Sequence, residues 1–123
     1  MKNGFLIIAH NPIGMAFQEA LVKIFGVVPE CVFVDIDSDE AQDKIVNKIR
    51  QARLSLKTEQ IVMIQDIPGA TPANMAGIAC KGESIPTIYP LSMPLLFKLI
   101  GNRNLPLGDL LEKAKDVKTT VGF

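Results

Sequence analysis

Short apolar runs alternate with amphipathic segments along this chain, and this alternation is the feature that most restricts its fold. Four apolar runs predict buried strands, over residues 5–9, 31–36, 61–64 and 85–89. Apolar residues at helical spacing predict helices over residues 13–25, 73–80, 91–100 and 105–114, and a helix with an acidic start at 37–40 and an apolar face over 41–56. Residues 117–123 predict a final strand.

Strands that alternate with helices indicate an α/β fold. We expect a doubly wound, mostly parallel sheet with helices on both faces, built as one domain over residues 1–123. Right-handed crossovers then bring the carboxyl ends of all parallel strands to one edge of the sheet. The segments that follow the first and third strands, residues 10–12 and 66–72, should therefore meet.

Composition excludes several classes of function. Lys plus Arg and Asp plus Glu each number 13, so the chain lacks the basic excess of a nucleic-acid-binding protein. Cys31 and Cys80 lie far apart and predict free buried thiols of a reducing compartment. A single histidine makes a zinc site improbable. No apolar run approaches the ~20 residues that span a bilayer, and no signal peptide is visible, so we expect a cytoplasmic protein without membrane insertion.

His10 is the only histidine, and it directly follows the first predicted strand. Sites in open α/β sheets form at this carboxyl edge, and the unperturbed pKa of imidazole lies near neutrality. Taken alone, His10 is more simply explained as a loop residue, because position in a fold is a weak indication of function. The segment after the third strand changes that balance.

Asp66 ends the third strand and can reach the end of the first. A carboxylate that holds the proton of one ring nitrogen leaves the other nitrogen nucleophilic, although Asp66 alone could equally cap a turn. Gly69, Ala70 and Thr71 precede a helix, with Thr71 as its predicted N-cap, and amides at such a start bind anions. Together with His10, these residues predict a receptor for a phosphoryl group.

Nucleotide-dependent kinase chemistry is not indicated. The chain has no Walker-type glycine-lysine motif and no carboxylate cluster for magnesium. Phosphoryl transfer between protein side chains, with no metal and no cofactor, remains open.

Three motifs carry a resemblance to a known family: residues 9–14 (AHNPIG), 66–74 (DIPGATPAN) and 91–96 (LSMPLL). In this order and spacing, the chain resembles the IIA component of the mannose family of the bacterial phosphoenolpyruvate-dependent sugar phosphotransferase system. The likeness covers nearly the whole chain. Members often have glycine and serine in place of Ala70 and Thr71, asparagine in place of Ser92, and a bulky residue in place of Pro68.

The resemblance implies a phosphoryl relay. The carrier protein HPr donates phosphate to His10, which passes it to a IIB protein or domain; Asp66 orients the ring, and Thr71 with nearby amides holds the phosphoryl oxygens. It also implies a homodimer in which the last strand, residues 117–123, is antiparallel at the sheet edge and exchanged between subunits.

Other interpretations stay open. The chain could be a regulatory protein of an incomplete phosphotransferase system, in which the phosphorylation state of His10 is a signal to partners without sugar transport. A phosphotransferase subunit of a dihydroxyacetone kinase is less well matched, because that branch usually lacks the Thr-Pro-x-Asn pattern. An aspartate-phosphorylated receiver is disfavoured because Ala9 and His10 stand where such domains carry an acidic pair.

Overall fold

The computed structural model describes residues 2–67 and 71–122, and for residues 71–73 it describes the backbone only. Along the chain the elements are β1 (Asn3–His10), α1 (Ile13–Phe25), β2 (Cys31–Ile36), α2 (Gln42–Ser55), β3 (Gln60–Gln65), α3 (Thr71–Ala79), β4 (Thr87–Ile88), α4 (Met93–Gly101) and α5 (Leu107–Ala114). The predicted alternation of strands and helices is confirmed through α5.

The four strands form one parallel sheet in the order β2-β1-β3-β4. β1 is central and pairs with β2 through Phe5 opposite Cys31 to His10 opposite Ile36. It pairs with β3 through Asn3 opposite Gln60 to Ile8 opposite Gln65. The carboxyl ends of β1, β2 and β3 therefore lie at the same edge, as the sequence predicts.

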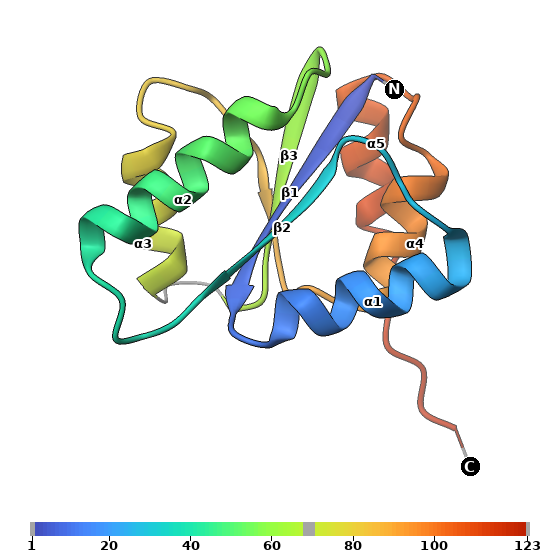
Figure 1. Cartoon of the computed structure of the whole chain (residues 1–123). Helices are drawn as coiled ribbons and strands as arrows, with labels where there is room; N and C mark the ends of the chain where they lie inside the picture. The colour runs from blue at the N-terminus through green and yellow to red at the C-terminus, as the bar shows by residue number, and fades with distance from the viewer. Residues whose placement is uncertain (1, 68–70, 123) are drawn as a thin grey trace.

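Helices cover both faces of the sheet, which makes the fold doubly wound (Figure 1). α2 and α3 cover one face over a core that includes Leu6, Ile8 and Ile49; we call it the α2/α3 core. α1, α4 and α5 cover the other face over a core that includes Phe5 and Ile7; we call it the α1/α4/α5 core. Side chains of β1 thus alternate between two dry interiors, which explains why its sequence is apolar without interruption.

Local sequence signals mark the helix ends. Gly26 follows α1 with φ of 78°, a left-handed conformation that glycine adopts without strain. Ser92 caps α4, its Oγ accepting the N–H of Leu95 at 3.2 Å, and Pro94 stands in the first turn, where no N–H is needed. Ser92, which departs from the family pattern, thus has a structural role here.

The acidic residues before α2 do not begin that helix, contrary to the prediction. α2 begins at Gln42, after Ala41. Asp37 and Glu40 instead close a turn, in which the N–H of Asp37 donates to Glu40 Oε1 at 2.8 Å. Glu40 also pairs with Lys48 at 3.0 Å. These contacts keep the residues in a loop at the carboxyl edge of the sheet.

The last two predicted strands are shortened or missing. The fourth contains only Thr87 and Ile88, because Pro86 has no N–H to donate, although its carbonyl still accepts the N–H of Met63 at 2.9 Å. The predicted C-terminal strand does not form: residues 117–122 have no regular structure and lead away from the sheet (Figure 1). An antiparallel strand at the β4 edge is therefore absent from the described residues of this single chain.

Candidate functional site

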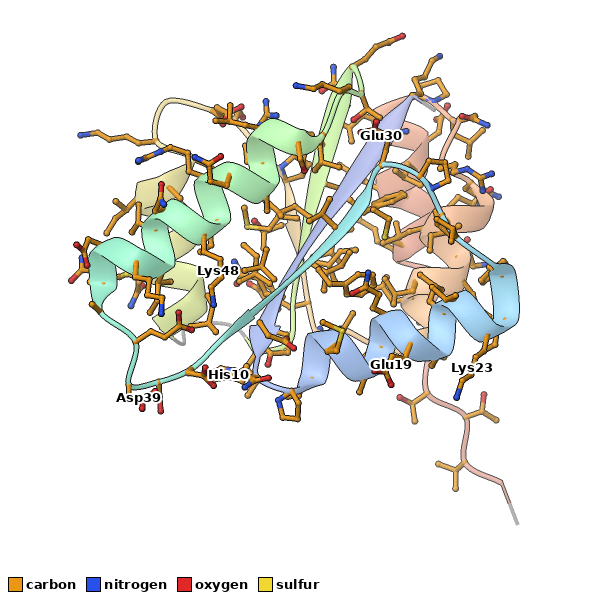
Figure 2. All side chains as sticks on the ribbon, viewed as in Figure 1. His10, Glu19, Lys23, Glu30, Asp39 and Lys48 are labelled. Carbon is orange, nitrogen blue, oxygen red and sulfur yellow. The ribbon has the colours of Figure 1, made fainter. Side chains whose placement is uncertain are left out.

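His10 is the last residue of β1 and lies at the carboxyl edge of the sheet. Figure 2 shows it beside the loop that carries Asp39, at the opposite end of the sheet from Glu30. The side chain is 35% exposed, so the ring is held by the protein yet open to a reactant. Leu6 and Ile8 face the α2/α3 core, and strand alternation puts the imidazole on that same face.

Asp66 follows β3 and binds His10 through a single oxygen. Oδ2 accepts the backbone N–H of His10 at 2.9 Å and also lies 2.9 Å from ring Nδ1. The other oxygen, Oδ1, accepts the N–H of Ile67 at 2.9 Å. The Asp66 side chain is only 6% exposed. The predicted approach of His10 and Asp66 across the sheet is thus present in the structure.

These contacts define which ring nitrogen is free. Burial raises the pKa of the Asp66 carboxyl, but the hydrogen bonds from the backbone and ring of His10, together with the N–H of Ile67, outweigh it and leave the pKa below its usual value. An ionised carboxylate can only accept, so Nδ1 must be the donor. Neutral His10 then carries its lone pair on Nε2.

The predicted phosphate-binding residues are only partly described. Gly69 and Ala70 lie outside the described residues, as does Pro68. Thr71 is the first residue of α3, whereas the sequence predicted it as the N-cap residue just before the helix. The side chain of Thr71 is also outside the described part. The backbone does place the start of α3 at the edge where β1 ends (Figure 1). A helix start at this position can attract an anion.

The two cysteine thiols are poor nucleophiles. Cys31 and Cys80 are both free thiols. Burial raises the pKa of Cys31 to about 12 and is also the main reason why the pKa of Cys80 is raised. Both are therefore protonated near neutral pH and weakly nucleophilic.

No metal centre or membrane segment is found in the residues that the structure describes. Within 2–67 and 71–122, no group of three or more His, Cys, Asp or Glu side chains could hold a metal ion. Of the described helices, none is both long enough and apolar enough to cross a bilayer.

Sequence reasoning missed one part of the site, the attachment of the turn after His10 to β2. The carboxylate of Asp35 accepts the N–H groups of Gly14 and Met15, at 2.7 and 2.9 Å. The amide of Asn11 donates to Asp37 Oδ1 at 2.8 Å. The available signal was Pro12, which begins the turn into α1 but has no side chain that can cap a helix.

Together, the fold and the site define a class: a doubly wound α/β protein with a carboxylate-oriented histidine at the carboxyl edge of its sheet, next to a helix start. A family model described as "PTS system fructose IIA component" matches residues 4–115. The chain therefore belongs to this EIIA-man family, the IIA components of the sugar phosphotransferase system, as the sequence motifs predict.

Individual relatives agree with this assignment. The chain is 27% identical over 100 residues to the sorbose-specific EIIA component of Lacticaseibacillus casei, a match that covers 80% of this chain and 72% of the relative. Two solved structures share the fold with TM-scores of 0.77. They are a phosphotransferase system component EIIA from Streptococcus agalactiae (18% identity; 92% of this chain and 89% of that one) and a mannose/sorbose specific IIA subunit from Enterococcus faecalis (14% identity; 100% and 97%).

Proposed function

We propose that this chain is a cytoplasmic phosphoryl-relay protein that accepts a phosphoryl group from phospho-HPr on His10 and passes it to a IIB protein or domain. The observation that carries the proposal is the pairing of His10 Nδ1 with Asp66 Oδ2 at 2.9 Å. This pairing leaves Nε2 as the nucleophile on a ring that is one-third exposed. Membership of the IIA family supports the same chemistry.

In the proposed step, Nε2 of His10 attacks phosphorus as the bond to the donor histidine of HPr breaks. Positive charge develops on the imidazole, and the Asp66 carboxylate stabilises it while Nδ1 keeps its proton. The backbone amides at the start of α3, with Gly69, Ala70 and Thr71, are proposed to hold the phosphoryl oxygens. In the second transfer, from His10 to the IIB partner, the same groups hold the ring and the phosphoryl oxygens.

We also propose that the protein acts as a homodimer that exchanges its C-terminal segment. Residues 118–122 are exposed and extend from the body of the chain. Among the described residues, β4 pairs with β3 only, so its other edge offers backbone groups with which an added strand could pair. A second copy of residues 118–123 would supply such a strand.

The relay is tested with purified protein, phosphoenolpyruvate, enzyme I and HPr. The wild-type chain should gain one phosphoryl group that is labile in acid and stable in base, and should lose it when a IIB domain is added. His10→Asn is the matched variant, because its amide nitrogen lies near the position of Nδ1 and can still donate to Asp66. Labelling of this variant would contradict the proposal. Labelling of the wild type without onward transfer would favour the regulatory interpretation.

A further inference from the structure

We propose that Asp35 is a positioning residue for His10: its carboxylate clamps the first turn of α1 and thereby fixes the turn that connects His10 to that helix. This inference rests on the proposed role of His10 as the phosphoryl acceptor. Asp35 belongs to β2, so its carboxylate reaches from β2 to the turn that follows the neighbouring strand, β1.

α1 depends on Asp35 because it has no cap of its own. Its N-cap residue is Pro12, and no side chain within the turn caps the helix. The two oxygens of Asp35 instead accept the N–H groups of Gly14 and Met15, at 2.7 and 2.9 Å. Hydrogen bonds from backbone N–H groups to a carboxylate are among the stronger ones, and negative charge is favoured at a helix N-terminus.

Gly14 makes this close approach possible. A Cβ at this position would overlap Oδ1 of Asp35 and come within 3.2 Å of its carboxyl carbon. The residue is buried in the first turn of α1, where glycine contributes no side chain to the packing. We infer that the contact with the Asp35 carboxylate requires glycine at position 14.

The clamp acts on the opposite side of the sheet from the imidazole. Cys31 and Phe33, which alternate with Asp35 along β2, pack against the α1/α4/α5 core, so Asp35 faces α1. The ring of His10 lies on the α2/α3 face. Asp35 therefore has no part in the chemical step itself, and its influence on His10 passes through the backbone of residues 11–14.

Two further contacts hold the same turn, one with the last residue of β2 and one with the residue that follows β2. The backbone N–H of Asn11 donates to the carbonyl of Ile36 at 3.0 Å, and its side chain donates to Asp37 at 2.8 Å. The turn is thus held by β2, whereas the ring is held by Asp66 after β3. Transfer requires both, because a reacting group misplaced by ~1 Å can lose about 100-fold in rate.

The test compares Asp35→Ala with wild type in single-turnover phosphorylation by phospho-HPr. We expect the maximal rate to fall by about tenfold to 100-fold, with little change in the HPr concentration at half-maximal rate. The ¹⁵N spectrum of His10 should still report a proton on Nδ1, since the bond to Asp66 is retained. Asp109→Asn is the matched control, an exposed first-turn acid of α5, and should behave as wild type.

Gly14→Ala, which leaves Asp35 in place, keeps the inference testable if Asp35→Ala is poorly folded; where Asp35→Ala folds, a double-mutant comparison sharpens the test. Gly14→Ala alone should reduce the rate, because its methyl group displaces the carboxylate. In the Asp35→Ala background the same change should cost almost nothing, since the obstructing oxygen is gone. Additive effects of the two changes, or a wild-type rate for Asp35→Ala, would overturn the inference and leave the relay intact. Absence of label on the wild type would overturn both.

Discussion

One oxygen of Asp66 accepts two hydrogen bonds from His10, one from the backbone N–H and one from ring Nδ1, each at 2.9 Å. The backbone bond fixes where the carboxylate stands relative to the end of β1, and the ring bond fixes the orientation of the imidazole. A side chain that would otherwise rotate freely at a strand end is thus held, and its Nε2 takes no part in the pairing with Asp66. This arrangement suits the role proposed for His10, a nucleophile that accepts and releases a phosphoryl group.

Asp66→Asn should keep the fold and slow phosphorylation of His10. The neutral amide cannot stabilise the positive charge that develops on the imidazole. Either orientation of the amide also sets its N–H₂ against a backbone N–H, that of His10 or that of Ile67, so the ring is held less firmly. Removal of one charge-stabilising group typically costs about 10²–10³-fold in rate. Rapid-quench kinetics measure the rate, and ¹⁵N shifts of the His10 ring report the tautomer. An unchanged rate in the folded variant would remove Asp66 from the mechanism.

The pH dependence of stability should also change in Asp66→Asn. The pKa of Asp66 is lower in the folded chain than its usual value, so the carboxylate stabilises the fold above the unfolded-state pKa of about 4. That contribution is lost as pH falls through the folded-state pKa. Urea unfolding between pH 6 and pH 3 should therefore show a shallower decline for Asp66→Asn than for wild type. Equal slopes would show that the hydrogen bonds to His10 and Ile67 do not favour the charged form; Asp109→Asn serves as the control.

The sheet that carries the site depends on the α1/α4/α5 core. Leu99 of α4 is fully buried, so Leu99→Ala should lower the free energy of unfolding by about 2–5 kcal/mol. Leu54 makes a matched comparison because it is 56% exposed on α2. The same truncation there should cost no more than about 0.5 kcal/mol. Denaturant titrations measure the free energy of unfolding of both variants. Similar losses for Leu99→Ala and Leu54→Ala would contradict the burial of Leu99.

Deleting residues 118–123 should separate dimerisation from folding. Val117 packs against the α1/α4/α5 core and is retained in this variant, whereas residues 118–122 are exposed. The full chain has a mass of 13.4 kDa, so light scattering should give twice that value for the wild type and about the monomer mass for the truncated chain. Circular dichroism should be nearly unchanged. If the full chain and the truncated chain contain the same number of subunits, exchange of the C-terminal segment is rejected.

Periodicity predicted most of the fold because burial on both faces of a parallel sheet leaves a strong pattern. The continuous apolar run of β1 and the helical spacing in α1 are local signals, and both elements lie where expected. The meeting of His10 and Asp66 followed from topology, since parallel strands end at one edge. Neither inference needed knowledge of distant side-chain contacts.

The parts that were mispredicted or missed depend on long-range contacts. Asp35 caps a helix that begins more than 20 positions earlier in the chain, and no local spacing encodes that bond. Asp37 and Glu40 resemble a helix start, yet they bind Asn11 and Lys48 instead. Residues 117–123 have strand-like composition, but a strand forms only when it pairs with an edge, and within the described part of the chain nothing pairs with the free edge of β4.

The central claim is that Asp66 holds the proton on Nδ1 of His10 and so leaves Nε2 to receive the phosphoryl group. Phosphorus–nitrogen coupling in the phosphorylated, ¹⁵N-histidine-labelled protein tests this most directly, because the chain has one histidine. A coupling between phosphorus and Nε2, with Nδ1 still protonated, is the predicted result. Phosphorus bonded to Nδ1, or phosphate found on any residue other than His10, would contradict it.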